Sequence, residues 1–361
     1  MDLGKDPETG KRQQKWFSGF KTKRDAEKAL VEKLNELNRG EYVEPSKMSF
    51  ETLIRSWIED RVRHSVSQKT YDTYKYLSEK HVIPGIGRIP LNNLNPIHLQ
   101  KFYSDLLGKG LSPTSVRRIH QVCRSSLKWA QQIKLIPKNP AESVSPPKKS
   151  SPEMKIWSVE EVEKFLECAR GERFYTLFLL ALHTGLRQGE LLGLRWSDIN
   201  FEQGVVYVRR AVQRNSKGLV IKEEPKTSKS RRSVYVSPSV VEELKRHRRR
   251  VKEEMMKIGR TDVDLVFPNQ LGNIQEPRKV IQHFHRLIER AGVPKIRFHD
   301  LRHTHASLLL QQGVHPKIVS ERLGHSNISI TLDIYSHSVP SLQKQASEVF
   351  DSLLKKGRKS I

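Results

Sequence analysis

Residues 299–337 contain several basic side chains and a tyrosine. His299 and Arg302 are three residues apart, which places them on one face of a helix. His325 follows a Leu-Gly pair, and Tyr335 lies ten residues beyond it. This set of side chains, with no pair of acids beside it, indicates chemistry on a phosphate.

A second arginine comes from far upstream. Residues 174–182 form an apolar helical run that ends near Gly185 and leaves Arg187 at the start of the next turn. Arginine binds phosphate oxygens through two parallel donors and keeps its charge, so Arg187 and Arg302 could clamp one phosphodiester. They would also stabilise the negative charge of the transition state. Tyr335 is then a nucleophile that can attack the phosphorus covalently.

Three helical segments must hold these side chains in place. The apolar residues of 300–310 recur at helical spacing and predict a buried stripe: Leu301, Ala306, Leu308 and Leu309. Pro316 predicts the start of a second helix and Gly324 its end, so that the break turns His325 toward the same place. A third helix near residues 328–335 would carry Tyr335.

The β-rich part of the chain should supply a lysine. Its alternating pattern predicts three antiparallel strands, over residues 204–214, 219–227 and 231–237. The loop between the last two strands carries Lys226, with Lys229 as a competing candidate. A lysine on a mobile hairpin can approach a leaving oxygen once the substrate is seated. We interpret the neighbouring Arg231 and Arg232 as phosphate contacts.

Four motifs now stand in order: T-G-L-R-x-G-E at 184–190, the hairpin lysine, H-D-L-R-H-T at 299–304, and L-G-H followed by a tyrosine. Each motif alone is weak, but together they resemble the tyrosine recombinase (phage integrase) family. The resemblance implies six catalytic positions: Arg187, Lys226, His299, Arg302, His325 and Tyr335. We also expect Glu190 to orient the guanidinium of Arg187 as a supporting partner.

The resemblance also implies a mechanism. Tyr335 would form a 3′-phosphotyrosyl link, and Lys226 would protonate the departing 5′ oxygen, a role worth roughly 100- to 10,000-fold in rate. The arginines and His325 would bind the nonbridging oxygens, while His299 accepts or relays the tyrosine proton. In this mechanism neither a cofactor nor a catalytic metal is needed, because the link conserves the bond energy and arginines neutralise the phosphate.

Metal binding is a rival reading of the same helix. His299 and His303 mimic the H-E-x-x-H zinc motif, in which two imidazoles one turn apart grip one ion. The acid between them is Asp300, one methylene shorter than the required glutamate, and Arg302 would sit beside a dication. We therefore favour the phosphate reading, and we interpret His303, His305 and His337 as structural.

Charge and composition point to the partner. The 361 residues carry a formal net charge of +25, which implies a polyanion, and double-stranded DNA is the partner we expect. The two cysteines, Cys123 and Cys168, lie in helical patterns and should pack as reduced thiols. The longest apolar run, residues 175–182, is too short to cross a membrane, so we expect a cytoplasmic protein without membrane partners.

The fold class we predict is multidomain and mainly helical, with small β-sheets. Its parts are a small α+β arm-type DNA-binding domain at 1–47, a helical core-binding domain at 48–140, a linker at 141–155, a mixed α/β catalytic domain at 156–340 and a helical tail at 341–361. The first residues read as the inside of a strand, so we expect that a preceding strand is absent. A solvated basic helix with no DNA role is the alternative for the first domain.

Basic residues on exposed helix faces are the predicted DNA contacts of the core-binding domain. Ser112 and Pro113 predict a helix start, and this helix should bury a stripe from Val116 to Ala130. The residues left for phosphates are Arg117, Arg118, Arg124 and Lys128 on this helix, and Lys69 and Thr70 in an earlier cluster.

The function we predict is site-specific recombination that integrates and excises a phage or mobile element. The resemblance implies a homotetramer on paired core sites, with arm sites elsewhere, and leaves room for a directionality factor and a DNA-bending host protein. A topoisomerase-like nicking and closing enzyme and a noncatalytic DNA-binding protein of the same fold are the alternatives. The apolar stripe of the tail could dock on its own domain or on a neighbouring subunit.

Overall fold

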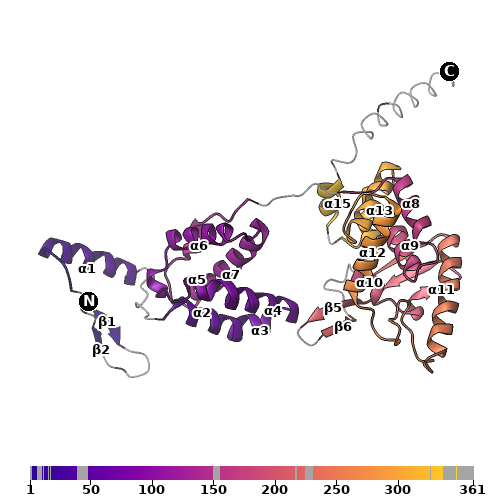
Figure 1. The fold of residues 1–361 in the computed structure, drawn as a ribbon. Coiled ribbons are helices and arrows are strands. Elements are labelled where there is room, and N and C mark those ends of the chain that lie inside the picture. The colour runs from indigo at the N-terminus through magenta and orange to yellow at the C-terminus, as the bar shows by residue number, and fades with distance from the viewer. Residues whose placement is uncertain are drawn as a thin grey trace, which may run out of the picture. The chain divides into compact units, whose positions relative to one another are not determined.

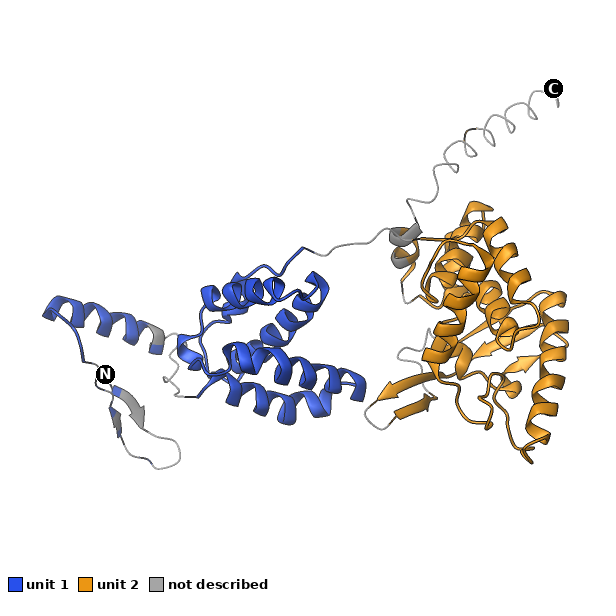
Figure 2. Cartoon of the chain, viewed as in Figure 1, with its two compact units in different colours: residues 1–152 blue, residues 153–361 orange. Residues whose placement is uncertain are grey.

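The computed structural model describes residues 2–5, 10, 12–14, 16, 18–38, 48–148, 155–215, 218–223, 231–325, 327–335 and 347. The chain forms two compact units, Met1–Pro152 and Glu153–Ile361 (Figures 1 and 2). Several predictions fall outside the described residues: the loop with Lys226 and Lys229, His337, and the tail apart from Ser347. The predicted domain boundaries stay predictions.

The first unit begins with a small hairpin and a helix. Strands β1 (Asp2–Lys5) and β2 (Arg12–Gln14) pair antiparallel, and helix α1 (Lys23–Asn38) follows. The hydroxyl of Thr22 accepts the N–H of Asp25 at 3.2 Å, which caps the first turn of α1. The hairpin and the helix agree with the small α+β part predicted for this end of the chain.

The rest of the first unit is helical throughout. Its elements are α2 (Phe50–Ser56), the π-helical η1 (Trp57–Val62), α3 (Arg63–Ser65), α4 (Gln68–Leu77), the π-helical η2 (Ser78–Val82), α5 (Ile83–Ile86), the short η3 (Leu91–Asn93), α6 (Pro96–Gly108), α7 (Pro113–Gln132) and the short η4 (Pro140–Ser143). The Ser112 hydroxyl caps α7 as predicted, with Pro113 at the first position. The predicted stripe of α7 is fully buried: Val116, Ile119, Val122, Cys123, Leu127 and Ala130.

The second unit is built around one buried helix. Helix α9 (Tyr175–Thr184) is apolar on all sides, and α8 (Val159–Ala169), α11 (Pro238–Met256) and α13 (Asp300–Gln311) pack against it (Figure 1). The remaining helices are α10 (Gln188–Leu192), the short η5 (Trp196–Asp198), α12 (Pro277–Ala291), α14 (Pro316–Leu323) and α15 (Ile328–Tyr335). Because α9 lies inside the unit, the Gly185 turn at its end is fixed from several directions.

The strands of the second unit pair differently from the prediction. Strand β4 (Val205–Val208) lies between β3 (Ile199–Asn200) and β7 (Arg232–Tyr235), while β5 (Ala211–Asn215) pairs with β6 (Gly218–Lys222) in a separate sheet. The three-strand prediction was therefore wrong, because the first expected strand splits in two. The split occurs at Arg209 and Arg210, whose guanidiniums both reach the buried carboxylate of Asp198.

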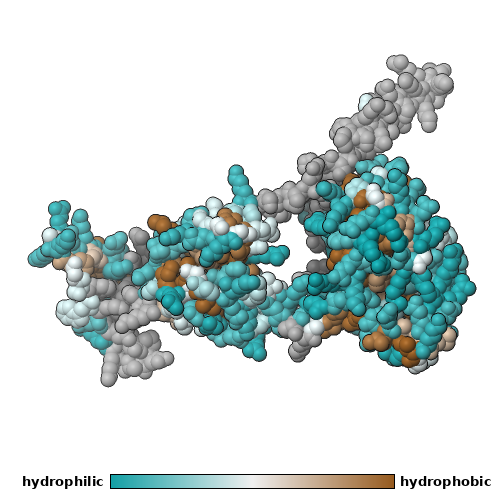
Figure 3. All heavy atoms as spheres, viewed as in Figure 1, coloured by the Kyte–Doolittle hydropathy of each residue, from teal (hydrophilic) through white to brown (hydrophobic). Residues whose placement is uncertain are grey.

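Each unit has its own hydrophobic core, and both present polar surfaces. The core of the second unit centres on the rings of Trp157, Phe165, Phe178 and Phe284. On the face shown in Figure 3, hydrophilic residues cover most of the described surface. Within the described part of the chain, no helix is both long enough and apolar enough to span a bilayer. The mainly helical fold class with small antiparallel sheets is confirmed.

Candidate active site

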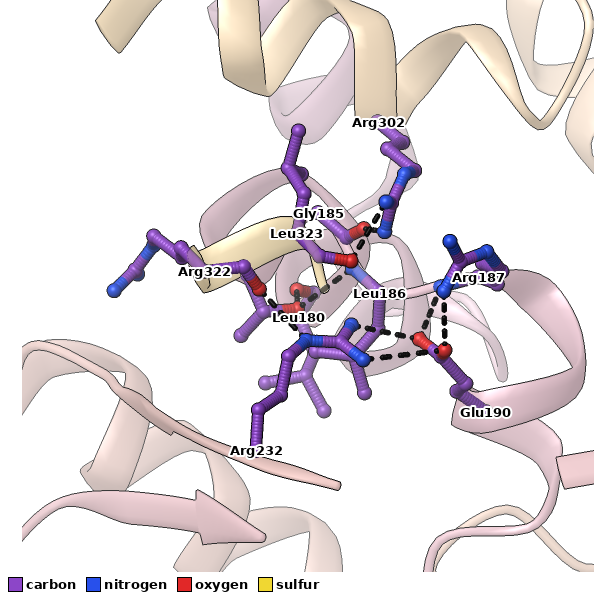
Figure 4. Close-up of polar contacts among 10 residues, drawn as sticks. Leu180, Gly185, Leu186, Arg187, Glu190, Arg232, Arg302, Arg322 and Leu323 are labelled. Atoms are coloured by element: carbon purple, nitrogen blue, oxygen red, sulfur yellow. Dashed lines mark hydrogen bonds and ion pairs between the residues drawn. The ribbon is translucent and has the colours of Figure 1, made fainter. Parts of the chain in front are cut away.

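Arg302 lies at the centre of the predicted site and is almost completely buried, with 3% of its surface exposed. Its Nη1 donates to the carbonyl oxygen of Gly185 at 2.8 Å, and its Nη2 donates to that of Leu323 at 2.6 Å (Figure 4). These carbonyls belong to the ends of α9 and α14, which are far apart in sequence. Arg302 therefore holds together the two turns from which Arg187 and His325 emerge.

Arg187 stands at the start of α10 and is fixed by Glu190. The carboxylate of Glu190 accepts the Arg187 backbone N–H at 2.9 Å and its guanidinium Nη1 at 2.8 Å. The Arg187 side chain remains 40% exposed, whereas that of Glu190 is 7% exposed. This geometry agrees with the expectation that Glu190 orients Arg187, and it leaves the arginine accessible to a ligand.

Two arginines share the Glu190 carboxylate. Arg232, at the start of β7, donates to Glu190 Oε2 from Nη2 at 2.8 Å and to Oε1 from Nη1 at 3.2 Å (Figure 4). Burial alone would raise the pKa of Glu190, but Arg232, and then Arg187, outweigh that effect and lower it to about 2. Arg232 was predicted as a phosphate contact, and the structure places its side chain inside the protein, 6% exposed.

His325 is aimed by the turn that ends α14. Gly324 adopts the left-handed conformation with φ of +67°, and the N–H of His325 returns to the Ser320 carbonyl at 3.0 Å. Together with the bond from Gly324 to Glu321, this forms a Schellman motif, so the predicted helix end at Gly324 is confirmed. The Nδ1 atom of His325 lies 2.8 Å from the hydroxyl of Thr331, which is fully buried.

The two predicted site histidines lie in the field of the two arginines. Burial and then Arg302 and Arg187 lower the pKa of His325 to about 4. His299 is exposed, yet protein atoms around its ring, followed by Arg302 and Arg187, also lower its pKa. The structure thus brings Arg187, His299, Arg302 and His325 into one electrostatic environment. Both imidazoles are neutral near pH 7 in the absence of a ligand.

His303 and His305 have different surroundings. The His303 ring stands edge to face against His299, with 5.0 Å between the centroids. The Nδ1 atom of His305 lies 2.7 Å from the Leu182 carbonyl, and its Nε2 accepts from Arg322 Nε at 3.2 Å. Because a carbonyl only accepts and a guanidinium only donates, His305 is held as one neutral tautomer. Among the residues that the structure describes, no three His, Cys, Asp or Glu side chains gather as a metal-binding group.

The structure does not describe the side chains of two predicted catalytic residues. Tyr335 is the last residue of α15, but its side chain, like the whole of Lys226, lies outside the described residues. Helix α15 does pack against α14 and α13, and its Thr331 touches His325. The backbone position of α15 therefore places residue 335 on an element that contacts the site.

A basic groove of about 810 Å³ opens beside His325. The basic side chains of its walls, two arginines, a lysine and His325, outnumber the one carboxylate, that of Glu321. The walls are formed by Arg231, Arg232, Lys317, Ser320, Glu321, Gly324, His325, Asn327 and Ile328. Another groove of about 780 Å³ runs along α11, and none of its lining residues belongs to the predicted site. The groove beside His325 has the charge that a phosphate backbone requires.

The predicted DNA contacts of the first unit lie on its surface. Arg117, Arg118, Arg124 and Lys128 are all exposed on α7, on the side opposite its buried stripe. Lys69 is exposed on α4, whereas Thr70 is partly buried and its hydroxyl lies 3.0 Å from that of Ser67. Arg117 also donates to the Pro147 carbonyl at 2.9 Å.

Sequence reasoning missed three residues that build the site. Arg322 donates to the His183 carbonyl at 2.7 Å and to that of Tyr235 at 2.9 Å, and Thr331 supports His325. The third is Arg232 in its role as a partner of Glu190. Arg322 and Thr331 lie close to the L-G-H motif and could have been inspected as its neighbours. The Arg232 contact joins residues 42 positions apart, and no local pattern signals it.

Family comparisons account for most of the chain. The model described as the phage integrase family matches residues 156–341, which is more than half of the sequence. The chain belongs to the phage integrase family. The model of the family's N-terminal SAM-like domain matches residues 49–107, and an arm DNA-binding domain model matches residues 1–37. Membership carries the enzyme class, which is tyrosine-type site-specific DNA recombination.

Curated members of the integrase family align over nearly the full length. A tyrosine recombinase XerC-like protein of Caldanaerobacter subterraneus subsp. tengcongensis is 34% identical, with 98% of this chain and 95% of the relative covered. The ICEBs1 integrase of Bacillus subtilis is 26% identical, with 98% and 96% covered.

Solved integrase structures share the fold. The Tn1549 transposon integrase in complex with a circular intermediate DNA has a TM-score of 0.71 at 23% identity, covering 84% of this chain and 99% of that one. A lambda integrase tetramer bound to a Holliday junction has a TM-score of 0.62 at 18% identity, with 93% of each chain covered.

Proposed function

We propose that this recombinase cuts and rejoins double-stranded DNA with Tyr335 as nucleophile and Arg187, Arg302 and His325 around the scissile phosphate. The observation that carries the proposal is the junction made by Arg302, which bonds to the ends of both α9 and α14. That junction brings the turn before Arg187 and the turn before His325 to one place. A basic groove opens beside them, as a phosphate substrate requires.

The arginines stabilise the charge that builds up on phosphorus. Arg187 is held at its backbone and its guanidinium by Glu190, so little reorganisation is needed when the phosphate arrives. Arg302 is held by two carbonyl oxygens and therefore keeps its place before DNA binds. Prearranged donors of this kind commonly supply the largest part of a rate enhancement.

His325 acts as a neutral hydrogen-bond donor in this proposal. If its Nδ1 accepts the Thr331 hydroxyl, Nε2 carries the proton and can donate to a nonbridging oxygen. A neutral donor at this position suits its lowered pKa, because neighbouring arginines already oppose a further positive charge. His299, also neutral, accepts or relays the proton of Tyr335.

In the chemical step, one bond to phosphorus forms and one breaks. The Tyr335 oxygen forms a bond to phosphorus, the bond from phosphorus to the 5′ oxygen breaks, and Lys226 donates the proton that the leaving oxygen takes up. A 5′ hydroxyl from a partner strand then attacks the phosphotyrosine and reverses the sequence. Because the phosphotyrosyl link retains the energy of the phosphodiester, the rejoining step consumes no nucleotide.

The exposed basic face of α7 and the basic groove of the second unit are the surfaces we assign to duplex DNA. We assign roles to three segments by analogy with the family: residues 1–47 for arm sites, 48–140 for the core site and 156–340 for catalysis. We further propose a homotetramer on paired sites, as in the lambda integrase complex with a Holliday junction. Because the substrate is chromosomal and mobile-element DNA, we place the enzyme in the cytoplasm, with integration and excision as its reactions.

A nicked suicide duplex tests the nucleophile. The duplex carries the crossover sequence read from the junctions of the encoding element, and a nick beside the scissile phosphate lets the short product diffuse away. Wild-type protein should accumulate as a covalent adduct, whereas Tyr335→Phe should bind the duplex equally well and form none. Tyr207→Phe, which alters a tyrosine on β4, is the matched control and should behave like wild type. An adduct with Tyr335→Phe would refute the assignment.

Two intact duplexes, one of them labelled, separate recombination from nicking and closing. Both carry the crossover site without a nick, so the 5′ end released by each cleavage stays in its own duplex. Recombination predicts that the labelled strand is joined to the strand of the other duplex. A topoisomerase-like enzyme would reseal each duplex to itself, and in that case no heterologous joint would form.

A further inference from the structure

Arg232 occupies an unusual position at the base of β7. Its Nε donates to the carbonyl oxygen of Arg322 at 2.7 Å, while its two other nitrogens hold the carboxylate of Glu190 at 2.8 and 3.2 Å (Figure 4). One buried guanidinium thus connects strand β7, the last turn of α14 and the first turn of α10.

The connection to α10 reaches Arg187 through Glu190. The Glu190 carboxylate receives two donors from Arg232 and two from Arg187. Since Arg187 is 40% exposed, its own two bonds leave much of its side chain without support from the protein interior. The buried partner, Arg232, is the one that fixes where the carboxylate lies and hence where it holds Arg187.

The connection to α14 is reciprocal. Arg232 donates to the backbone carbonyl of Arg322, and the Arg322 side chain donates to the backbone carbonyl of Tyr235, at the other end of β7. Both bonds join the same strand to the same helix. The strand and the helix therefore cannot slide past each other without breaking a charged hydrogen bond.

The turn before His325 rests against the same guanidinium. A Cβ atom built on Gly324 would lie 2.9 Å from Arg232 Nη1 and 3.1 Å from its Cδ. Only glycine fits this close approach in the left-handed conformation. The direction in which His325 leaves α14 is thus set by a turn packed on Arg232.

We infer that Arg232 is a positioning residue for strand cleavage, which aligns Arg187 through Glu190 and His325 through the end of α14. The inference rests on the proposed function, because it assigns Arg232 a role only through Arg187 and His325. Strand β7 also follows residues 224–230 in the sequence, so the same side chain fixes the position at which β7 begins. A direct phosphate contact by Arg232 is the competing role.

Cleavage rate and DNA affinity distinguish these roles. We expect Arg232→Met to lower the first-order rate of covalent adduct formation at saturating suicide duplex by roughly 100-fold, the size of effect that a misplacement of about 1 Å can have. The dissociation constant for the duplex should stay near the wild-type value. A loss confined to affinity would overturn the inference in favour of a phosphate contact.

Arg173 provides a matched control. Its guanidinium also binds one carboxylate, that of Glu254 at 2.8 Å, and one backbone carbonyl, that of Pro268 at 3.3 Å. Neither partner belongs to the proposed site. Arg173→Met should lower thermal stability but leave the cleavage rate within a few-fold of wild type. If Arg232→Met cleaves as fast as Arg173→Met, the inference is wrong.

A charge-retaining variant and a double variant test the route. Arg232→Lys keeps one charged donor for Glu190 and should recover part of the rate lost in Arg232→Met. Glu190→Gln combined with Arg232→Met should be little slower than the worse single variant, because both changes break one chain of contacts. Fully multiplicative losses would show that Arg232 does not act through Glu190.

The pH profile of cleavage gives a further readout. Burial raises the pKa of Glu190, and Arg232 is the main group that lowers it, so Arg232→Met should move the acid limb of the cleavage rate to higher pH. An acid limb that moves to higher pH equally in Arg173→Met would contradict the inference. These outcomes are separable from failure of the proposed function itself, in which wild-type protein would form no adduct at Tyr335.

Discussion

A buried guanidinium is stable only when its donors meet acceptors, and this protein uses that requirement to build its site. Arg302 is anchored on two backbone carbonyls, and Arg232 on a carboxylate and a carbonyl. Neither anchor involves a flexible surface side chain. At the scale of single residues, Arg302 and Arg232 are therefore held in place by acceptors inside the protein.

Gly324 combines a left-handed backbone conformation with close packing against Arg232. Gly324→Ala should lower the free energy of unfolding by about 1–2 kcal/mol for the left-handed conformation alone, and by more because the new Cβ collides with Arg232. Gly313→Ala is the control, since Gly313 has φ of +78° but open space around it. Denaturant unfolding should show a larger loss for Gly324→Ala, and cleavage should fall only in that variant. Equal losses of stability and rate would contradict the predicted role of the contact.

His305 makes stability depend on pH. Burial, and then the charge of Arg322, lower its pKa to about 3 against an opposing bond to the Leu182 carbonyl, with His183 and Arg302 also nearby. In the unfolded chain His305 binds a proton with its ordinary pKa of 6.5. The stability that His305 contributes is therefore complete above pH 6.5 and falls as the pH drops toward 3. Between pH 7 and 5 the loss should be about 2 kcal/mol. Unfolding curves of His305→Gln at both pH values should show a smaller difference than wild type.

At the scale of elements, α15 is the helix that joins the proposed nucleophile to the rest of the site. It carries Thr331 one turn before Tyr335, and the Thr331 hydroxyl lies 2.8 Å from His325 Nδ1. The position of α15 and the orientation of the His325 ring are thus linked by one hydrogen bond. A displacement of the helix would disturb both groups together.

Removing that hydrogen bond should slow cleavage without unfolding the helix. Thr331→Val keeps the shape and removes the hydroxyl, so His325 loses the partner that selects its tautomer, and the rate of adduct formation should fall roughly 10- to 100-fold. Thr331→Ser keeps the hydroxyl and should retain most of the rate. A Thr331→Val enzyme that cleaves as fast as wild type would show that the contact is not used.

Several helix ends were predictable, and the strand pairing was not. Pro113, Pro316, Gly185 and Gly324 mark their helices through local backbone preferences that a sequence displays directly. The split between β4 and β5 depends instead on the buried carboxylate of Asp198, which draws two arginines out of the strand. A contact of that kind is set by the tertiary fold.

The same distinction applies to the candidate site. The family motif supplied Arg187, Arg302 and His325, and the structure brings these three together. The contact between Arg232 and Glu190 was not predicted, because the two residues are 42 positions apart and no local pattern signals their pairing. A charge in a basic stretch does not reveal from sequence alone whether it faces solvent.

At the scale of the whole molecule, two separate cores and one dominant charge set the behaviour. Each unit buries its own hydrophobic cluster, and the whole chain carries a formal net charge of +25. Association with DNA should therefore depend strongly on salt, because each neutralised phosphate releases counterions. A plot of log affinity against log salt should be steep and linear, with a slope of about −0.9 for each phosphate contacted.

Basic residues of α7 should account for a defined part of that slope. Arg118→Ala combined with Lys128→Ala should reduce its magnitude by about 1.8, while adduct formation at saturating DNA stays close to wild type. Arg63→Ala is the control, since Arg63 is paired with Glu59 at 2.8 Å. Filter binding at several salt concentrations measures the slopes. A slope unchanged by the double variant would place the DNA elsewhere.

The two carbonyls that hold Arg302 also act on it electrostatically. They lie at the C-terminal ends of α9 and α14, where aligned peptide dipoles concentrate partial negative charge. The two helix dipoles offset the buried positive charge in the DNA-free protein, so the catalytic unit can fold around Arg302 without a polyanion. In the proposed reaction, an incoming phosphate meets an arginine whose desolvation was completed during folding, long before the first strand is cut.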